Sequence, residues 1–277
     1  MHSTKYSVLM SIYAKENPCY FESAANSMLN QTMQPDEFIL VCDGPLSSEL
    51  ESKIELLMQN NVCPVKIVRL PACKGLGNAL RLGTQQCSCE IVARMDSDDV
   101  AASDRMEKQI SYLEAHPEID VLGGQIAEFE VSPEDISAYR RVPCNYSDIV
   151  RFAAERNPMN HMTVAFRRDA VLEAGNYRVF DRFEDYDLWA RMLAKGSRFE
   201  NLDSVLVFAR IDENTYRRRG GVAYFFQTIQ LQKVLRTTGL INSLDFAKNI
   251  AIRFVGTVLL PSSIRARIYH RHLRSEM

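Results

Sequence analysis

A short apolar segment followed at once by three carboxylates is the feature that most constrains the fold of this chain. Residues 90–95 read Glu-Ile-Val-Ala-Arg-Met, and Asp96-Ser97-Asp98-Asp99 come directly after them. A run this short, bounded by polar residues, is typical of a buried strand. Open α/β sheets bind their ligands outside the carboxyl ends of their strands. The sequence therefore predicts an α/β fold with a polar site at this turn.

The spacing within the acidic turn indicates a cation site. In an extended segment residues two apart point the same way, so Asp96 and Asp98 can share one target. Oxygen ligands of this kind suit Mg²⁺ or Mn²⁺. A helix–loop–helix calcium site is excluded because Val100 and Ala101 stand where a ligand and a Gly would be needed. A phosphatase with Asp96 as nucleophile, or a plain acidic loop, stays open.

Strand and helix patterns alternate along the chain. The near-continuous apolar character of residues 6–13 favours burial on both faces, as in a parallel sheet. Asp43 follows the second predicted strand, so it should share a sheet edge with Asp96. Residues 130–160 read as irregular. We predict a mostly parallel sheet flanked by helices, with strands at 6–13, 37–42, 65–70, 91–95, 120–129, 163–168 and 205–211, and helices at 17–31, 47–60, 77–84, 103–116, 169–175 and 183–195.

Composition limits the class of protein. A chain of 277 residues with 46% apolar and 25% charged side chains can form one large domain with an appendage. The net charge of -2 gives no reason to expect a nucleic-acid partner. Seven scattered cysteines fit a reduced, cytoplasmic chain. No signal-peptide pattern is evident, and no apolar run approaches the ~20 residues that span a bilayer.

Charge is distributed unevenly. From Arg210 to Met277 there are 12 basic and 4 acidic side chains, a net of +8. We predict a basic helical region over 216–277. Within it, an amphipathic helix after Pro261 would carry Arg265, Arg267, Arg271 and Arg274. Such a helix can lie in the interface of an anionic membrane. A helix packed on the body or in an oligomer is the alternative left open.

A set of ordered motifs resembles the bacterial family 2 glycosyltransferases. These motifs span roughly residues 5–215, with a nucleotide-binding part over about 1–100 and an acceptor part over about 101–215. They are Val8 to Tyr13, Val41-Cys42-Asp43-Gly44, Lys74-Gly75-Leu76-Gly77-Asn78-Ala79-Leu80, Ala93-Arg94-Met95-Asp96-Ser97-Asp98-Asp99, Arg105 with Gln109, and Glu184-Asp185-Tyr186-Asp187-Leu188-Trp189. The resemblance implies a GT-A-like, nucleotide-diphospho-sugar transferase fold, and in particular the enzymes that build exopolysaccharide, capsule or O-antigen units.

The resemblance also implies roles for single residues. Asp185 would be the general base, with Asp98 and Asp96 at a Mn²⁺ or Mg²⁺ ion. Donor-binding residues would be Tyr13, Asp43, Gly75, Asn78, Asp96 and Ser97, with Asp43 at the uracil edge. One departure is Cys73, which stands where the family often has Asn. Acceptor or supporting residues would be Glu184, Trp189, Arg105 and His161.

Several of these positions have a structural alternative. Asp185 could simply cap a helix, and Asp187 is the second candidate for the base. Trp189 could stack on a sugar ring or lie in the core. His161 could lie near the metal or be an ordinary buried histidine. Arg94 and Arg105 could pair with the acidic turn or contact phosphate.

The function implied by the resemblance is transfer of a hexose or N-acetylhexosamine, with inversion, from a UDP-sugar to a saccharide acceptor. The acceptor would be linked to undecaprenyl diphosphate, and the chain would sit peripherally at the inner face of the cytoplasmic membrane. A metal-dependent phosphatase and a non-catalytic nucleotide-sugar binding module are the alternatives.

Overall fold

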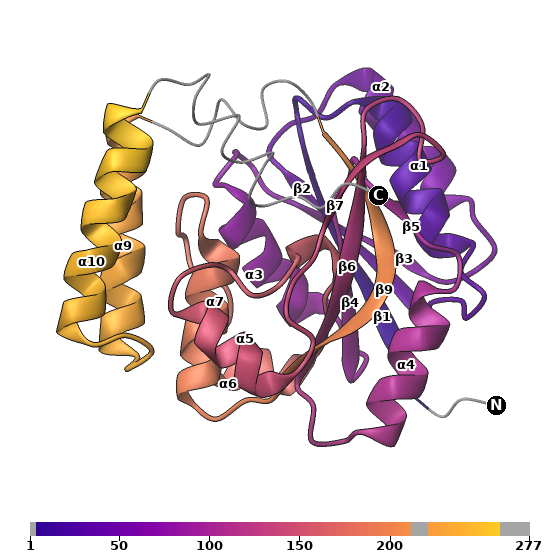
Figure 1. The fold of residues 1–277 in the computed structure, drawn as a ribbon. Coiled ribbons are helices and arrows are strands. Elements are labelled where there is room, and N and C mark those ends of the chain that lie inside the picture. The colour runs from indigo at the N-terminus through magenta and orange to yellow at the C-terminus, as the bar shows by residue number, and fades with distance from the viewer. Residues whose placement is uncertain (1–3, 212–220, 261–277) are drawn as a thin grey trace.

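A computed structural model describes residues 4–211 and 221–260 (Figure 1). Its first half is a parallel sheet in the order β3-β2-β1-β4. The strands are β1 (Tyr6–Tyr13), β2 (Glu37–Asp43), β3 (Val65–Arg69) and β4 (Ile91–Met95), connected through helices α1 (Pro18–Leu29), α2 (Ser48–Met58) and α3 (Leu76–Gln86). The observed order of strands and helices confirms the predicted strand–helix alternation in this half of the chain.

The second half extends this sheet with mixed pairing. The sheet continues from β4 through β8, β6 and β9 to β5, and β7 pairs with β6. Strand β8 is antiparallel to both β4 and β6, whereas β6 and β9 are parallel. The added elements are β5 (Val100–Ala101), α4 (Arg105–Ala115), β6 (Val121–Phe129), β7 (Ile136–Arg140), α5 (Tyr146–Ala153), the 3-10 turn η1 (His161–Thr163), β8 (Ala165–Arg167), α6 (Arg168–Glu173), α7 (Glu184–Ala194) and β9 (Phe199–Arg210).

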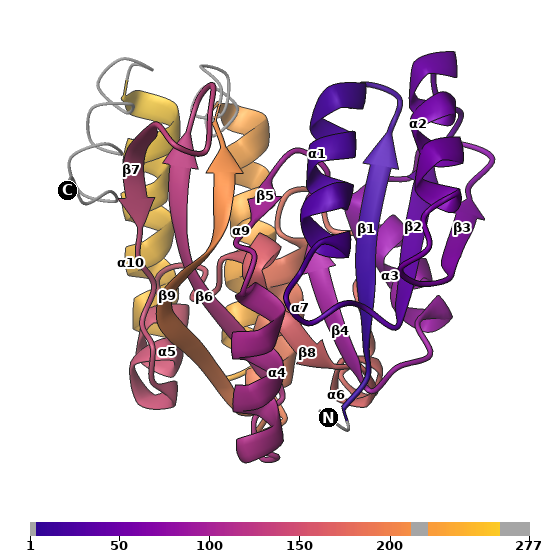
Figure 2. The same cartoon turned by 90° about the vertical axis from the view of Figure 1, so that its right-hand side faces the viewer.

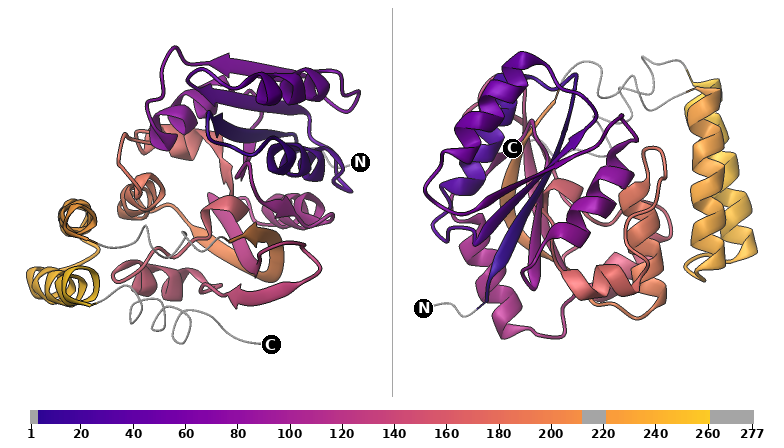
Figure 3. Two further views of the ribbon diagram at one scale, coloured as in Figure 1. Left: turned by 90° about the horizontal axis from the view of Figure 1, so that it is seen from above. Right: turned by 180° about the vertical axis from the view of Figure 1, so that it is seen from behind.

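Helices cover both faces of the sheet, whose strands are spread across the view in Figure 2 and are seen from two further sides in Figure 3. Because successive strand side chains alternate between faces, Val8 and Leu9 of β1 belong to different cores. The Val8 core is closed by α1, α2 and α4. The Leu9 core is closed by α3, α5, α6 and α7. The sheet is therefore the middle layer of three.

The structure corrects three details of the sequence prediction. Residues 130–160 are not irregular, since they contain β7 and α5, and the Asn145 side chain caps α5 by accepting from the backbone N of Asp148. Strand β9 begins at Phe199 and not at residue 205, because it follows β6 along its length. Asp169 lies in the first turn of α6 and does not cap it.

Two helices follow the sheet domain and form an antiparallel hairpin beside α7 (Figure 3). They are α9 (Val222–Thr237) and α10 (Ser243–Phe254), continued by the π-helical turn η2 (Val255–Leu259). Leu231 and Leu235 of α9 pack against Tyr186 and Ala190 of α7. Both helices lie within the predicted helical region 216–277.

Two further findings concern this C-terminal region. The predicted basic helix with Arg265, Arg267, Arg271 and Arg274 lies outside the described residues. Within the described residues, none of the helices combines the length and the apolar character needed to cross a bilayer.

Candidate active site

Three strands bring the predicted site residues to one edge of the sheet. Because β1 and β2 run parallel with Tyr13 opposite Asp43, these two residues lie side by side where their strands end. Strand β4 is parallel to β1 on its other side, with Met95 opposite Met10, so the acidic turn follows at the same edge. The expected meeting of Asp43 and the acidic turn at one sheet edge is thus confirmed.

The Asp43 carboxylate holds the loop that precedes α3. Its Oδ1 accepts from the backbone N of Lys74 at 2.7 Å, and its Oδ2 accepts from the backbone N of Gly75 at 2.9 Å. The Cys73 thiol also donates to Oδ2, with Sγ at 3.1 Å, and this bond raises the pKa of the thiol. Gly44 allows this approach, since a Cβ there would lie 2.7 Å from the Cys73 nitrogen. Asp43 and Cys73 therefore fix the loop before α3.

The other predicted donor-binding residues surround this loop. The Tyr13 ring is exposed at the strand end and free to meet a ligand. Gly75 adopts a left-handed φ of 88° and begins α3. Asn78, one turn into α3, is buried and accepts from Arg81 at 3.3 Å. The Ser97 hydroxyl, in the acidic turn, donates to Glu16 from the loop after β1.

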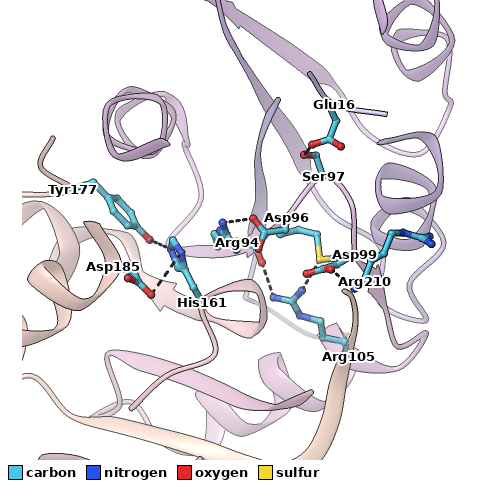
Figure 4. Close-up of polar contacts among 11 residues, drawn as sticks. Glu16, Arg94, Asp96, Ser97, Asp99, Arg105, His161, Tyr177, Asp185 and Arg210 are labelled. Carbon is cyan, nitrogen blue, oxygen red and sulfur yellow. Dashed lines mark hydrogen bonds and ion pairs between the residues drawn. The ribbon is translucent and has the colours of Figure 1, made fainter. Parts of the chain in front are cut away.

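The three carboxylates of the acidic turn have different environments, and Figure 4 shows two of them, Asp96 and Asp99. Asp96 is partly exposed and paired with the buried guanidinium of Arg94. Asp99 is buried and accepts from the backbone N of Arg210 in β9 at 2.8 Å. Burial, together with the charges of Asp96 and Glu16, raises the pKa of Asp98 to about 7. Asp98 is thus an acidic side chain whose ionisation is disfavoured until a cation approaches.

The oxygens of the acidic turn do not by themselves complete the coordination of a cation. In the part of the chain that the structure describes, no cluster of three or more His, Cys, Asp or Glu side chains has the arrangement of a finished metal site. Mg²⁺ is commonly held by one or two carboxylates with substrate phosphates as further ligands. Asp98 and Asp96 would be the carboxylates of such a site.

Arg105 supports the acidic turn from inside the core. It is fully buried, donates from Nη2 to the Arg94 carbonyl at 2.8 Å, and donates from Nε to Gln109 at 3.0 Å. Its Nη1 lies 3.3 Å from the Met95 sulfur. Arg105 therefore supports the end of β4 through contacts with backbone and core atoms.

Asp185 lies in the first turn of α7, beside segments from distant parts of the chain (Figure 4). Its Oδ1 accepts from the backbone N of Tyr186 at 2.7 Å. Its Oδ2 accepts from Asn157 Nδ2 at 2.5 Å and lies 4.0 Å from Nδ1 of His161. Burial raises the pKa of Asp185, while the bond from Asn157 lowers it. A buried carboxylate held on one side in this way has the environment of a general base.

The neighbours of Asp185 on α7 serve the fold. Asp187 is buried and pairs with Arg191, which donates from Nε at 2.9 Å and from Nη2 at 2.8 Å. This buried ion pair commits Asp187 to Arg191 and speaks against Asp187 as the alternative base. Trp189 is fully buried, with its ring edge-on to those of Tyr177, His161 and Phe199. Of the two alternatives for Trp189, stacking on a sugar or a place in the core, the structure favours the core.

Glu184 and His161 are adjacent to the Asp185 carboxylate. Burial raises the pKa of Glu184 to about 8, and the charge of Asp185 adds to this. Burial lowers the pKa of His161 well below its usual value, and the charge of Arg94 acts in the same direction. The imidazole is therefore neutral, and its Nδ1 lies 4.0 Å from Oδ2 of Asp185.

Sequence reasoning missed Asn157 and Tyr177 as members of this site. Asn157 lies between α5 and η1, in the stretch that the sequence predicted to be irregular. Tyr177 follows α6, and its hydroxyl lies 3.0 Å from Nε2 of His161. Neither residue stands in a motif, so only the folded chain brings them to Asp185.

A parallel nucleotide-type half sheet joined to a mixed half sheet, with carboxylates at their shared edge, defines a GT-A glycosyltransferase. Residues 7–175 match the family model described as Glycosyl transferase family 2. This match covers more than half of the chain, and the chain belongs to that family.

Two full-length relatives and two solved structures are similar to the chain. It is 38% identical to the amylovoran biosynthesis glycosyltransferase AmsE of Erwinia amylovora, over 96% of this chain and 98% of the relative. It is 35% identical to a UDP-Gal:alpha-D-GlcNAc-diphosphoundecaprenol beta-1,3-galactosyltransferase of Escherichia coli, over 98% of this chain and 97% of the relative.

The solved structures share the fold at low sequence identity. Residues 1–349 of TarS from S. aureus, in complex with UDP-GlcNAc, give a TM-score of 0.67 at 18% identity, covering 96% of this chain and 75% of that one. A mannosyltransferase from Pyrobaculum calidifontis, in complex with GDP-Man and Mn²⁺, gives 0.64 at 15% identity, covering 95% and 72%.

Proposed function

We propose that the chain is an inverting glycosyltransferase that moves a hexose or N-acetylhexosamine from a UDP-sugar to a lipid-linked saccharide in surface polysaccharide synthesis. The observation that carries this proposal is the pair of acidic groups at one edge of the sheet. Figure 4 shows Arg94 between the acidic turn and the Asp185 side of the site. Its charge lowers the pKa of both Asp98 and Asp185. A donor diphosphate at the turn would bring its sugar toward Asp185.

Each acidic group has a distinct task in this reaction. Asp98 and Asp96 would hold Mn²⁺ or Mg²⁺, which when bound neutralises a diphosphate leaving group. Asp185 accepts the proton of the acceptor hydroxyl, since the bond from Asn157 and the charge of Arg94 favour its ionised form. Attack from the face opposite the leaving group inverts the anomeric centre. Tyr13, Asp43, Gly75, Asn78 and Ser97 would form the donor pocket.

The donor and acceptor classes are supported by the relatives. The Escherichia coli relative is named for transfer from UDP-Gal to GlcNAc-diphosphoundecaprenol, and the TarS complex holds UDP-GlcNAc. The Mn²⁺ in the mannosyltransferase complex supports a divalent cation at the acidic turn. We therefore assign a UDP-hexose or UDP-N-acetylhexosamine as donor and an undecaprenyl-diphosphate-linked saccharide as acceptor.

A lipid-linked acceptor requires the chain to work at a membrane surface, and the helical hairpin offers a surface for this. The start of α9 and the end of α10 lie together, since Gly221 donates from its backbone N to the Thr257 carbonyl at 3.0 Å. Apolar side chains are exposed at this end of the hairpin. They are Val222, Phe226, Ile252, Phe254, Val255 and Leu259. We assign residues 1–215 to catalysis and 216–277 to peripheral attachment at the inner face of the cytoplasmic membrane.

A panel of nucleotide sugars tests the donor and metal assignments. Thermal unfolding is measured with UDP-, GDP- and dTDP-sugars, each with Mn²⁺, Mg²⁺ or EDTA. A ligand at ~100 times its dissociation constant stabilises a protein by about 2.7 kcal/mol. We expect this stabilisation with a UDP-sugar and a divalent cation, and its loss in Asp98→Ala. Equal stabilisation in excess EDTA would contradict the metal assignment.

Turnover distinguishes the remaining alternatives. We expect transfer from the stabilising UDP-sugar to a synthetic saccharide-diphosphate-lipid, with an inverted linkage seen by NMR. A donor that binds without transfer to any acceptor would favour a binding module. Release of phosphate without transfer would favour the phosphatase, an alternative that the family membership of the chain already speaks against.

A further inference from the structure

The described side chains around Asp185 approach only one of its two carboxylate oxygens, Oδ2. Oδ2 receives Asn157 Nδ2 at 2.5 Å and faces His161 Nδ1 at 4.0 Å. Among residues 4–211 and 221–260, the one hydrogen-bond donor to Oδ1 is the backbone N of Tyr186, at 2.7 Å. A carboxylate oxygen can accept two hydrogen bonds. Oδ1 therefore keeps a lone pair for a reacting proton, whereas Oδ2 is committed to the protein.

We propose that Asn157 and the His161–Tyr177 pair are positioning residues that hold the Asp185 carboxylate ionised and oriented for proton transfer. This inference rests on the role proposed above for Asp185, and it adds three residues that no motif indicates. We call these three residues the Asp185 clamp.

The amide of Asn157 can present only its donor to Asp185. Its Oδ1 already accepts from the backbone N of Met159 at 3.2 Å. This turn orients the amide so that Nδ2 points toward the carboxylate. A hydrogen bond to a charged acceptor stabilises the charged form, so Asn157 favours the ionised base.

The segment that carries Asn157 and His161 is anchored to the sheet. Asn160 donates from Nδ2 to the Gly124 carbonyl in β6 at 2.8 Å. Asn201 of β9 donates from Nδ2 to the Pro158 carbonyl at 3.2 Å. The Thr163 hydroxyl accepts from the backbone N of Gly124 at 3.0 Å. These bonds give the clamp a rigid base, which positioning to a fraction of an ångström requires.

Tyr177 sets the proton position on His161. The imidazole is neutral, so only one of its nitrogens carries hydrogen. A bare Nδ1 lone pair facing the Asp185 charge would be repelled, whereas Nδ1–H is attracted. The Tyr177 hydroxyl, 3.0 Å from Nε2, can donate to that nitrogen, and its own ionisation is suppressed because burial raises its pKa. The pair therefore presents Nδ1–H to Oδ2.

Other charged groups act on Asp185 from every side. Glu184 of α7 is its neighbour and has its own pKa raised to about 8 by burial and by the Asp185 charge. Arg94 of β4 and Arg140 of β7 both lower the pKa of Asp185. These groups are unchanged in variants of the clamp, so a shift in such a variant reports the clamp itself.

The test compares Asn157→Leu and Tyr177→Phe in the full chain, with Asp185→Asn as reference. The control is Tyr112→Phe. It removes the hydroxyl by which Tyr112 of α4 donates to Glu200 of β9, away from Asp185. Transfer rates are measured from about pH 5 to about pH 9, together with the dissociation constant for UDP. The pKa of the Asp185 carboxyl is also read without turnover, by NMR of aspartate-labelled protein, with the signal assigned by its absence in Asp185→Asn.

We expect the acidic limb of kcat/KM to move upward by about 1 pH unit in Asn157→Leu, equivalent to about 1.4 kcal/mol. Tyr177→Phe should move it less, in the same direction. The NMR pKa should shift with the limb, UDP affinity should stay within about twofold, and Tyr112→Phe should match the wild type. Should Asn157→Leu fail to fold, the Tyr177→Phe shift decides alone.

Two results would overturn the proposed role of the Asp185 clamp. A third would overturn the role of Asp185 as the base and leave the clamp standing. The clamp is wrong if the limb and the carboxyl pKa are unchanged in both variants, or if both variants lose activity equally at every pH. A shifted pKa together with full activity of Asp185→Asn would instead overturn the proposed base. An unshifted pKa together with an inactive Asp185→Asn would overturn the clamp alone.

Discussion

Two aspartates on the same turn of α7 show how surroundings assign roles to identical side chains. Asp187 is neutralised by Arg191, whose Nη2 and Nε both donate to it. Asp185 instead accepts from the neutral amide of Asn157. A carboxylate in a buried ion pair loses that ion pair when it accepts a proton, whereas a carboxylate held by a neutral amide does not. These surroundings support the proposal that Asp185, and not Asp187, is the base.

Substitution of these two aspartates by Asn should have opposite consequences. In Asp185→Asn we expect turnover to fall by roughly 10²–10⁴, the usual contribution of a positioned base. Affinity for UDP should change little, because Asp185 lies apart from the donor residues. In Asp187→Asn we expect a loss of about 3 kcal/mol of unfolding free energy, because Arg191 is left buried without its counter-ion. The measurements are steady-state rates, UDP titration and urea unfolding.

The outcome that contradicts this assignment is the reverse pattern. If Asp187→Asn were folded at wild-type stability and inactive, while Asp185→Asn kept most of its turnover, Asp187 would be the base. Measuring turnover per folded molecule separates lost chemistry from lost protein.

Glu184 should make the stability of the protein depend on pH. Burial raises its native pKa to about 8, whereas an unfolded Glu titrates near about 4.3. Between these values the native state holds a proton that the unfolded chain releases, so wild-type stability falls as pH rises through this window. Glu184→Gln does not titrate there. Its stability relative to wild type should rise from about pH 5 to about pH 8, by more than about 1.4 kcal/mol.

Urea unfolding of both proteins across this pH range checks the Glu184 prediction. A stability difference that stays constant with pH would show that Glu184 is ionised in the native state throughout. Asp185→Asn is a useful companion, because removing that charge should lower the native pKa of Glu184 and narrow the window.

Helices and strands were predictable where each has its own apolar pattern. Strands β1, β2 and β4 carry continuous apolar runs. Helix α7 stands out because the stretch before it has no periodicity. Strand β5 has two residues and β7 is paired only with β6, so neither has a pattern that differs from a loop. The short α5 had a readable signal, an Asn cap at 145 followed by Asp148, which lay inside a stretch dominated by Pro and polar residues.

The contact between α3 and the start of α7 depends on Gly77. A Cβ at this position would lie 2.3 Å from the Arg178 carbonyl oxygen and 3.0 Å from Glu184 Cβ. Because backbone cannot give way like a side-chain tip, Gly77→Ala should push residues 176–184 away from α3. We expect a loss of about 1–3 kcal/mol of stability. Asp185 should be displaced as well, so turnover should fall at saturating substrate.

Gly256 provides the matched control for Gly77. It lies in η2, has no positive φ, and would meet nothing within 4 Å. Gly256→Ala should therefore be neutral or stabilising by up to about 1 kcal/mol, with turnover unchanged. Calorimetry and rates for the two variants give the comparison. Equal behaviour of both variants would show that the α3–α7 contact does not position the site.

Across the complete chain, the sequence identified the acidic residues of the site and missed their supports. Asp43, Asp98 and Asp185 stand in motifs, whereas Asn157 and Tyr177 reach Asp185 only through tertiary contacts. For Arg105 and Trp189 the sequence left two roles open, because sequence spacing does not reveal that both are fully buried. Motifs therefore locate the reacting groups, but the positions that tune them depend on how distant segments pack.

Membrane attachment is expected to depend on the exposed apolar end of the hairpin and on the basic residues that follow it. Each basic residue near an anionic surface contributes about 1 kcal/mol, and salt screens this attraction. The chain should pellet with anionic vesicles, less with neutral ones, and be released as salt rises. Deleting residues 261–277, which hold Arg265, Arg267, Arg271 and Arg274, should remove most of the salt-sensitive part.

Replacing Phe226 and Ile252 by Ser should weaken pelleting that persists at high salt, because both side chains are exposed on adjacent helices. The control replaces Leu56 and Met58, which are equally exposed on α2, on the opposite side of the molecule (Figure 1). That variant should pellet like the wild type, and all variants should still hydrolyse the donor. Equal loss in both apolar variants would indicate general surface adhesion. Unchanged pelleting in all of them would place the membrane contact elsewhere on the chain.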